Sequence, residues 1–484
     1  MNIALVLYVV GHVLCMEAVL MLLPIGVAFV TGVGDWMYFV YAMIPLVIVG
    51  VLLSFRKPKV MRMRMKEGLV SVALAWIFLS AFGALPFYFS GYFNSYVDCF
   101  FETVSGFTTT GSTILSDVEG LKNGGLMFWR SFTHWVGGMG ILVFVLAFLP
   151  NMDGSSVQLL RAESPGPMPG KVVPRLRETA RILYLIYFGM TILNILCLVL
   201  ADMPLYDSVI HAMGSAGTGG FSNRNLSVGA YHNPAAEWIL GVFMMLFGVN
   251  FSLYYLLLKR DVKGFFKNAE LRLYVAIMVG VTLLIAGNIV QDYCGGSWND
   301  ALRSAFFQAS TIMTTTGYSS TDFNLWPVFS KMLLLLLMIV GACAGSTGGG
   351  IKVSRLLVLF KTVKQEIRHL IHPRVVSAPR MDGKIIETGV VRGILIFFFT
   401  YITIAVVSMI LVSLDGFDVE TNVSAVLSAL GNIGPGLGTV GPMGNFGGYS
   451  AFSKLVLSFC MLAGRLELFP MLILFVPSTW RKSY

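Results

Sequence analysis

Charge is scarce in this sequence of 484 residues, since Asp, Glu, Lys and Arg make up 12% of it and hydrophobic residues make up 56%. Soluble globular domains usually carry about 25% charged residues. The low share therefore excludes an ordinary soluble protein. It indicates an all-α chain that crosses the membrane many times.

Cysteine and histidine are also scarce, with six residues of each. The cysteines stand singly, without the CxxC or Cys/His spacing of a metal site: Cys15, Cys99, Cys197, Cys294, Cys343 and Cys460. We interpret them as small apolar residues of the spans, and a disulfide between Cys99 and Cys294 is the alternative. No clustered acid, metal or nucleotide site is recognisable, so we expect neither enzymatic activity nor a cofactor in this chain.

Long apolar runs stand in place of the missing charge. Runs near the ~20 residues that a helix needs to cross a bilayer lie at about 4–30, 36–54, 69–90, 125–149, 182–201, 236–258, 272–291, 328–343, 390–414 and 452–476. They predict about ten spans. The first run follows no basic segment and precedes no small-residue cleavage site, so we interpret it as a span and not as a removable signal peptide.

Basic residues give the chain its net charge of +9, and their positions are more informative than their sum. They gather in alternate loops: Arg56 to Lys66, Arg161 to Arg181, Lys259 to Arg272, Lys361 to Lys384, and Arg481 with Lys482. By the positive-inside rule these loops and both termini lie in the cytoplasm, which requires an even number of spans. We therefore expect a topology signal and no nucleic-acid partner.

A four-part unit recurs from Leu69 onward: a span, a short amphipathic segment, a glycine loop and a second span. The loops read Thr109-Thr110-Gly111-Ser112, Gly219-Gly220-Phe221-Ser222, Thr315-Thr316-Gly317-Tyr318 and Asn432-Ile433-Gly434-Pro435. The central glycines Gly111, Gly220, Gly317 and Gly434 are 109, 97 and 117 residues apart. We therefore divide the chain into an accessory two-span hairpin (1–67) and four repeats (68–155, 156–262, 263–384 and 385–484).

Each glycine loop is too polar to face lipid. At membrane depth such backbone belongs where it lines protein or water, and its carbonyl and hydroxyl oxygens can replace the hydration shell of a cation. Glycine adopts the alternate-handed conformations that turn carbonyls toward one axis, although termination of the preceding helix is another reason for it. An acid marks the start of each short pore helix: Asp98, Asp207, Asp300 and Glu420. Asp98, Glu102, Asp207 and Asp300 also suggest an acidic outer mouth that concentrates cations.

The third repeat contains a second glycine-rich segment, from Gly341 to Lys352. Such a run cannot stay helical, because each glycine costs ~1 kcal/mol relative to alanine. It departs from the phosphate-loop order G-x-x-x-x-G-K-[ST], because Ile351 separates Gly350 from Lys352. We predict a flexible plug across the cavity below the glycine loops, with a simple helix kink as the alternative.

Arg465 lies within the last apolar run, where an arginine costs at least ~2.5–3.5 kcal/mol to insert. Glu467 is a poor partner for it, because residues i and i+2 of a helix point to different faces. We predict that Arg465 faces the pore and limits cation flux. His134 and His211 are interpreted as structural, with proton relay as the alternative.

These segments together resemble the Trk/Ktr/HKT superfamily of potassium transporters, most closely its TrkH-type members. The matching stretches are 100–113, 214–222, 306–318, 341–355, 431–438 and 464–469, in the expected order. The resemblance implies four span–pore-helix–filter-loop–span repeats around one pore, preceded by a two-helix hairpin. Glycine at all four repeat positions implies a preference for potassium. The second and fourth loops depart from Thr-Thr-Gly, which implies lower discrimination than in a potassium channel.

The resemblance also assigns roles to residues. The filter that binds potassium would comprise Thr109, Thr110, Gly111, Gly219, Gly220, Phe221, Thr315, Thr316, Gly317, Tyr318, Asn432, Ile433 and Gly434. The gate would comprise Gly345, Ser346, Thr347, Gly348, Gly349, Gly350, Lys352 and Arg465.

The predicted function is uptake of potassium through a channel-like pore in the bacterial inner membrane, and symport with sodium or protons is the alternative. The resemblance implies a homodimer and a cytosolic TrkA-like regulatory subunit of the RCK kind. That subunit would carry the nucleotide, ATP, ADP or NAD. It would dock on basic segments such as Arg161–Pro167 and Lys361–Arg380.

Overall fold

The computed structural model describes residues 1–60, 63–140, 176–373 and 378–481. Regular structure in these ranges is helical apart from one two-residue strand pair, β1 (Arg380–Met381) with β2 (Lys384–Ile385). The all-α prediction is confirmed. The predicted boundary between residues 155 and 156 and the basic segment Arg161–Pro167 lie outside the described residues, and the other repeat boundaries remain predictions.

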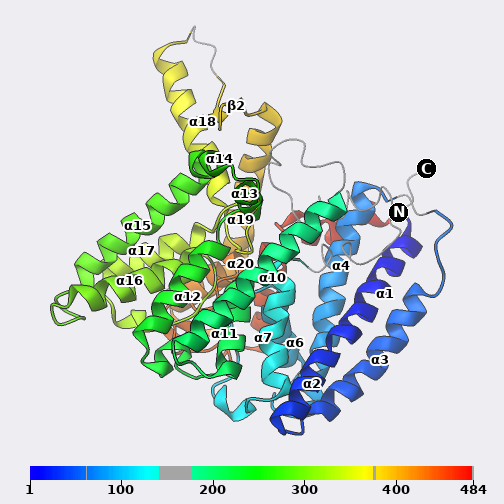
Figure 1. The fold of residues 1–484 in the computed structure, drawn as a ribbon. Coiled ribbons are helices and arrows are strands. Elements are labelled where there is room, and N and C mark those ends of the chain that lie inside the picture. The colour runs from blue at the N-terminus through cyan, green and yellow to red at the C-terminus, as the bar shows by residue number, and fades with distance from the viewer. Residues whose placement is uncertain (61–62, 141–175, 374–377, 482–484) are drawn as a thin grey trace.

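The helices follow the predicted order of a hairpin and four repeats (Figure 1). The hairpin contains α1 (Ile3–Leu20), α2 (Leu22–Thr31) and α3 (Trp36–Ser54). Repeat 1 contains α4 (Met65–Gly83), α5 (Leu85–Ser90), α6 (Tyr96–Phe107) and α7 (Gly125–Gly138). Repeat 2 contains α10 (Leu176–Leu200), α11 (Leu205–Gly217), α12 (Pro234–Phe247) and α13 (Phe251–Leu258), and α14 (Val262–Lys267) lies across its predicted boundary with repeat 3.

Repeat 3 contains α15 (Ala269–Ile289), α16 (Trp298–Met313), α17 (Val328–Ile339) and α18 (Val353–Ile371). Repeat 4 contains α19 (Thr388–Val412), α20 (Val419–Gly431), α21 (Ala451–Arg465), α22 (Phe469–Leu472) and α23 (Pro477–Trp480). Short 3₁₀ helices lie between them: η1 (Glu119–Leu121), η2 (Ser227–Tyr231), η3 (Phe323–Leu325), η4 (Ser413–Asp415), η5 (Gly438–Val440) and η6 (Ile473–Phe475).

The first helix of each repeat is long, whereas the helix after each glycine loop is short. Among the described residues, six helical segments are long and apolar enough to cross a membrane, or seven if α12 and α13, bent by 91°, count as one. The short helices α7, α12, α17 and α21 have 14, 14, 12 and 15 residues. Three of the apolar runs behind the predicted ten spans are therefore not continuous helices, because the chain breaks after α12, α17 and α21. The run predicted at 125–149 is described only as far as residue 140.

The second main helix of each repeat is a pore helix. α6, α11, α16 and α20 have 12, 13, 16 and 13 residues, so at ~1.5 Å per residue they are too short to span. The predicted acid lies in the first turn of all four. In α6 and α16 the hydroxyls of Ser95 and Ser297 accept the N–H of Asp98 and Asp300, as N-caps do. The predicted helix starts are confirmed.

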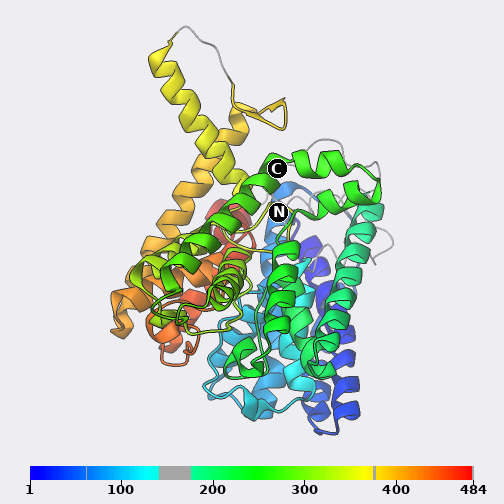
Figure 2. The ribbon, with the colours of Figure 1, turned by 60° about the vertical axis from the view of Figure 1, so that its left-hand side comes forward.

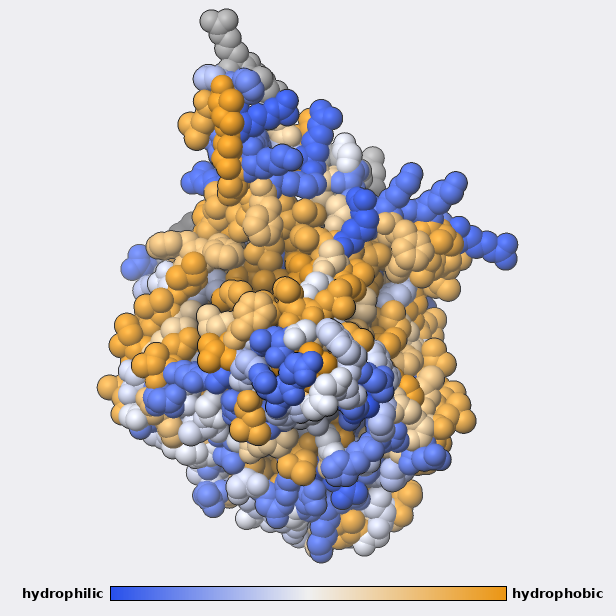
Figure 3. Space-filling model, turned by 90° about the vertical axis from the view of Figure 1, so that its left-hand side faces the viewer, coloured by the Kyte–Doolittle hydropathy of each residue, from blue (hydrophilic) through white to orange (hydrophobic). Residues whose placement is uncertain are grey.

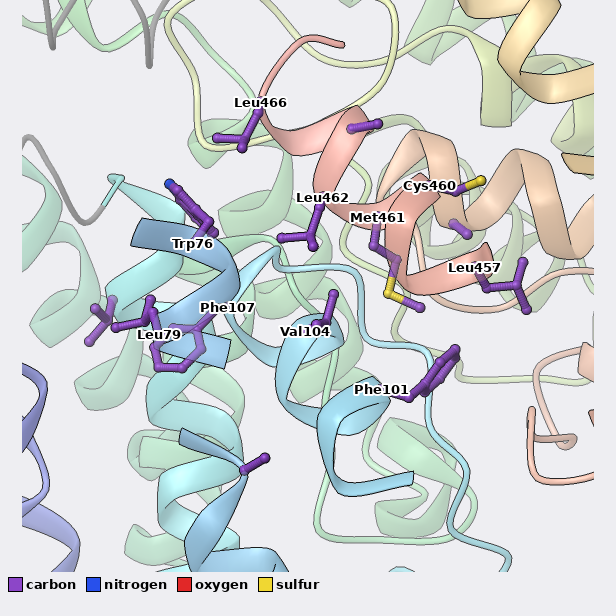
Figure 4. Close-up of a cluster of buried hydrophobic side chains, with 14 of the residues drawn as sticks. Trp76, Leu79, Phe101, Val104, Phe107, Leu457, Cys460, Met461, Leu462 and Leu466 are labelled. Atoms are coloured by element: carbon purple, nitrogen blue, oxygen red, sulfur yellow. The ribbon is translucent and has the colours of Figure 1, made fainter. Parts of the chain in front are cut away.

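The four repeats pack in a closed ring. The short helix of each repeat lies against the pore helix of the next: α7 against α11, α12 against α16, α17 against α20, and α21 against α6. The last contact returns from repeat 4 to repeat 1. Figure 4 shows its apolar core, in which Phe101 and Val104 of α6 lie near Leu457 and Met461 of α21. The loops between pore helix and short helix thus face one another around an axis.

The hairpin lies outside this ring. α1 packs against α3 and against α4 of repeat 1. The two hairpin helices approach closely at Gly11 and Gly50, because a Cβ at Gly11 would lie 2.8 Å from the carbonyl oxygen of Gly50.

Both termini lie at one end of the molecule, where the Met1 amino group is 3.4 Å from the Arg481 carbonyl oxygen. In Figures 1 and 2 the basic segment at α14 and the projecting α18 with its β-hairpin lie at this same end. Figure 3 shows apolar side chains across the middle of one face, with mostly hydrophilic residues below and both hydrophilic and apolar residues on the projecting part above. This arrangement suits a chain that crosses the membrane an even number of times.

Candidate ion pathway

The four glycine loops begin with the same helix-ending turn. The residue two before each repeat glycine is left-handed, with φ of 56° at Thr109, 56° at Thr218, 59° at Thr315 and 56° at Asn432. In loop 1 the Thr109 N–H donates to Gly106 O (3.1 Å) and the Thr110 N–H to Ser105 O (2.9 Å), and equivalent bonds of 2.8 to 3.3 Å recur in the other loops. This is the Schellman ending. The residue that caps each pore helix is therefore the Thr or Asn, and the helix-cap explanation for the repeat glycines is wrong.

The repeat glycines supply a second left-handed residue in each loop, with φ of 82°, 76°, 88° and 104° at Gly111, Gly220, Gly317 and Gly434. Two such residues, separated by one other, reverse the direction of successive carbonyl groups. L-residues adopt these conformations only with strain. The alternating backbone that the sequence predicts is present in all four loops.

The four loops also close into a ring in chain order. A Cβ added to Gly111 would collide with the carbonyl oxygen of Gly219 in the next loop. In the same way, a Cβ added to Gly220 would collide with the carbonyl oxygen of Thr316, one added to Gly317 with that of Ile433, and one added to Gly434 with that of Thr110. Glycine is therefore favoured at each position for two reasons: the positive φ and the neighbouring carbonyl group.

Loops 1 and 3 have a hydroxyl pair that the other two loops lack. Thr108 Oγ1 lies 2.8 Å from Thr110 Oγ1, and Thr314 Oγ1 lies 2.8 Å from Thr316 Oγ1. Loop 4 is held differently, because the Asn432 amide donates to Thr110 Oγ1 (3.0 Å) and to Met461 O (2.9 Å). The departure of loops 2 and 4 from Thr-Thr-Gly thus changes how each loop is supported.

Loop 2 is supported from behind by His134 of α7. The imidazole ring occupies the space that a side chain at Gly219 would need. Its Nδ1 lies 2.7 Å from Gly106 O, and its Nε2 accepts the Phe221 N–H at 3.2 Å. These partners require a neutral ring with the proton on Nδ1. His211 is similarly held by Asp207 O and Ser222 Oγ, so the structural interpretation of both histidines agrees with their contacts.

Arg130, also on α7, completes the support of loop 2. Its Nε donates to Glu102 of α6 at 2.7 Å, and one terminal nitrogen donates to Ser222 O at 2.9 Å. Its guanidinium carbon lies 3.6 Å from the centre of the Phe221 ring. The Arg130 and Glu102 side chains are 2% and 0% exposed, so the pair is a buried, charge-assisted hydrogen bond within repeat 1. Arg130 joins repeat 1 to repeat 2 through Ser222 O and the Phe221 ring.

The acids near the starts of the pore helices have cationic partners. Asp98 pairs with Lys454 at 2.6 Å, Asp207 with Arg224 at 3.5 Å, and Asp300 with Arg303 at 2.9 Å. Asp98, Glu102 and Asp207 are also buried. The acidic outer mouth expected from these residues is therefore wrong, since the nearby cations offset their charge.

Ion pairs instead join neighbouring repeats around the ring. Glu237 of α12 pairs with Arg303 of α16 at 3.0 Å, and Lys331 of α17 pairs with Glu420 of α20 at 3.4 Å. The Lys454–Asp98 pair joins α21 to α6. These pairs lie on the same helix contacts that close the ring.

The loop between α17 and α18 reaches the pore-helix side of the glycine loops. Its neck is closed by a bond of 2.8 Å from the Gly341 N–H to Ile351 O. The Gly349 N–H donates to Thr315 Oγ1 at 2.6 Å, and a Cβ at Gly349 would lie 2.9 Å from that of Asn432. The segment therefore touches two of the four loops, which excludes a simple helix kink.

Several bonds tie this loop to its surroundings. The N–H groups of Ala344 and Ser354 both donate to Glu270 Oε1, at 2.6 and 3.0 Å. The Thr347 hydroxyl donates to Phe247 O at 3.3 Å, and the Lys352 ammonium group donates to Gly348 O and Gly349 O. These bonds define one conformation of the loop, and its predicted flexibility stays a prediction.

Arg465, the last residue of α21, joins three repeats. Its guanidinium donates to Thr347 O at 2.7 Å, to Gly137 O at 2.5 Å and to Gly138 O at 2.7 Å. It thereby connects the end of α21 to the loop of repeat 3 and to the end of α7. Glu467 pairs with Arg355 instead, in agreement with the spacing argument.

The chain after Arg465 is strained. Glu467 and Leu468 have φ of 56° and 70°, and the Phe469 N–H donates to Glu467 O at 2.9 Å. With ψ of −56°, Leu468 is the centre of the rare γ-turn with positive φ. This turn ends α21 inside the apolar run and leaves the Arg465 side chain at the level of the loop.

The predicted filter residues all come from the four facing loops, but Phe221 and Tyr318 follow the glycines and pack behind them. The Tyr318 hydroxyl donates to His211 O at 3.1 Å. Thr218, Arg130 and Glu270, which were not singled out from the sequence, contact or form part of the glycine loops or the loop between α17 and α18, and His134, interpreted as structural, lies directly behind loop 2. Counting back two residues from each repeat glycine finds Thr218, whereas no sequence spacing marks the other three. All six cysteines, Cys99 and Cys294 included, are free.

Known proteins share this arrangement. The model of the TrkH family, described as cation transport protein, matches residues 37–482. The Trk system potassium uptake protein TrkH of Salmonella typhimurium is 37% identical over 87% of both chains, and that of Vibrio parahaemolyticus is 36% identical over 98% of this chain and 99% of its own. The crystal structure of the potassium transporter TrkH from Vibrio parahaemolyticus superposes with a TM-score of 0.90 and 34% identity, covering 99% of this chain and 100% of that one.

Proposed function

This chain belongs to the TrkH family of cation transport proteins, and we propose that it takes up potassium ions through a channel-like pore. The observation that carries the proposal is the ring of four loops, each with two left-handed residues and each glycine against the next loop's carbonyl. Backbone carbonyls turned toward one axis can replace the water around a potassium ion. The carbonyl ends of four pore helices add a negative potential there.

The ion-binding residues would be those of the predicted filter, with Thr218 added. Loops 2 and 4 differ from loops 1 and 3 in their supporting groups, so the oxygens that meet the ion are not related by fourfold symmetry. We expect potassium to be preferred over sodium, with less discrimination than a symmetric filter provides.

The gate would be the segment Gly345–Gly350 together with Lys352 and Arg465. Its supports are the bond from Gly349 to Thr315 beneath the filter and the tie from Arg465 to Thr347. Potassium that leaves the filter would have to displace this loop before reaching the cytoplasm. Inward movement would follow the membrane potential, worth ~2.3 kcal/mol per charge per 100 mV.

The chain would lie in a bacterial inner membrane with both termini in the cytoplasm. The common position of the termini and of the basic segments near α14 and α18 supports this orientation. A second copy of the chain and a cytosolic RCK-type subunit carrying ATP, ADP or NAD would complete the assembly. The projecting α18 and its basic residues offer a surface for that subunit.

Flux measurements on the purified protein in liposomes test the proposal. We expect uptake of potassium or rubidium that follows an imposed potential and needs no sodium or proton gradient. Stoichiometric movement of sodium or protons would favour the symport alternative. Absence of any cation flux, together with failure to rescue a potassium-uptake-deficient strain at low potassium, would refute both.

A further inference from the structure

An acid lies in the middle of the first apolar segment. Glu17 is the fifteenth of the 29 residues in Ile3–Thr31, and its side chain is 0% exposed. Both of its carboxyl oxygens lack a hydrogen-bond partner among the described residues. An ionisable group at this depth needs a functional explanation, because membrane segments rarely keep one.

The Glu17 carboxyl lies where the hairpin meets the first pore helix. A Cβ added to Gly83 of α4 would lie 2.8 Å from Glu17 Oε1, 2.8 Å from Phe107 Cε2 and 3.0 Å from Thr103 Cγ2. Phe107 is the last residue of α6, so filter loop 1 begins directly after it. The hydroxyl of Ser80, one turn before Gly83 on the same face of α4, is also buried without a partner.

Among the residues that the structure describes, no charged side chain is placed to offset a charge on Glu17. α3 carries none, and the charged residues of α4, Lys66 and Glu67, lie in its first turn, four turns from Gly83. The acids of α6, Asp98 and Glu102, are paired with Lys454 and Arg130. The remaining titratable groups on these elements are His12, Cys15, Tyr8, Tyr38, Tyr41, Cys99 and Tyr96, whose hydroxyl donates to Ala81 O.

We propose that Glu17 is a proton-binding site outside the ion pathway, and that its protonation controls the packing of filter loop 1. The neutral acid fits the closed junction at Gly83, whereas a carboxylate without partners is costly in such surroundings. Loss of the proton would therefore force α1 away from α4 and α6 or admit water beside Phe107. Because Thr110 touches Gly434 and Gly111 touches Gly219, a shift of loop 1 passes to both neighbouring loops.

The consequence for transport rests on the proposed function, but the proton site itself does not. Infrared spectroscopy of the purified full chain at acidic pH should show a protonated-carboxyl band that Glu17→Gln removes. Asp292→Asn, which changes an exposed acid after α15, should leave that band unchanged. A band that persists in Glu17→Gln, or its absence in the wild type, would overturn the site.

Flux in liposomes tests the coupling. From acidic to alkaline pH, the ratio of rubidium to sodium uptake should fall by about fivefold in the wild type, at the low end of typical coupling between two sites. Glu17→Gln, which mimics the neutral acid, should keep the acidic ratio throughout, whereas Glu17→Asp and Asp292→Asn should retain the pH dependence. An equal pH dependence in Glu17→Gln, or none in the wild type, would overturn the coupling. Absence of any flux would refute the proposed function and leave the infrared result to decide the proton site.

Discussion

Replacing Arg465 with alanine should raise potassium uptake. In the structure its guanidinium donates to Thr347 O in the loop between α17 and α18 at 2.7 Å and is itself anchored on Gly137 O and Gly138 O. A hydrogen bond from a charged donor contributes about 1.5–3 kcal/mol. If the bond to Thr347 is the only one lost when the loop moves aside, Arg465→Ala shifts the equilibrium toward the open loop roughly 10- to 150-fold. Removal of the positive charge from the pathway acts in the same direction.

The comparison with Arg465→Lys separates these two effects. Lysine keeps the charge, but its single ammonium group cannot span the loop and the end of α7 as the guanidinium does. If charge alone limits flux, Arg465→Lys should transport as slowly as the wild type in rubidium uptake by liposomes. If the tie to the loop matters, it should approach the alanine variant. Uptake by Arg465→Ala equal to that of the wild type would refute both accounts.

Three further variants test the filter and the loop in the same assay. Gly317→Ser should lower the ratio of rubidium to sodium uptake, because serine at φ of 88° is strained by ~1–3 kcal/mol and would meet Ile433 O. The control is Gly280→Ala, whose Cβ meets nothing within 4 Å. Equal uptake ratios in Gly317→Ser and Gly280→Ala would contradict the ring. Gly219→Ala should lower this uptake ratio as well. Adding His134→Ala to Gly219→Ala should partly restore the ratio, because the added methyl group and the imidazole ring compete for one space. A double variant whose loss equals the sum of the two single losses would exclude that competition. Lys352→Gln should raise uptake about tenfold, because the loop loses its cationic donor to Gly348 O and Gly349 O. Uptake at the wild-type rate in this variant would show that Lys352 does not hold the loop closed.

The pore helices and glycine loops could be predicted because their signals are local. An acid after a capping serine starts α6 and α16, and the repeat glycines mark positions that need positive φ. The ends of the short helices were harder to predict, because hydropathy reports apolar character and does not show where a helix breaks. The breaks after Phe247, Ile339 and Arg465 occur inside apolar sequence. They depend on contacts between repeats, such as the bond from the Cys343 N–H to Gly248 O at 3.0 Å.

The role of the charged residues also depended on tertiary contacts. From the sequence alone, Asp98 and Glu102 looked like free acids at a pore mouth, and nothing marked Arg130 as a partner. Lys454, the partner of Asp98, lies 356 residues away in the chain, and Arg130, the partner of Glu102, lies 28 residues away. Spacing along one helix carries no information on pairs of this kind.

The sequence by itself determined that this chain is a helical membrane protein of four repeats with one glycine loop in each, because composition, periodicity and glycine conformation act locally. Only the tertiary structure decided which carbonyl lies behind each repeat glycine, why Gly219 has no side chain, and how Arg465 reaches Thr347. These features arise where residues from different repeats occupy the same space. Their physical basis is therefore the packing of the ring, which no single segment of the sequence specifies.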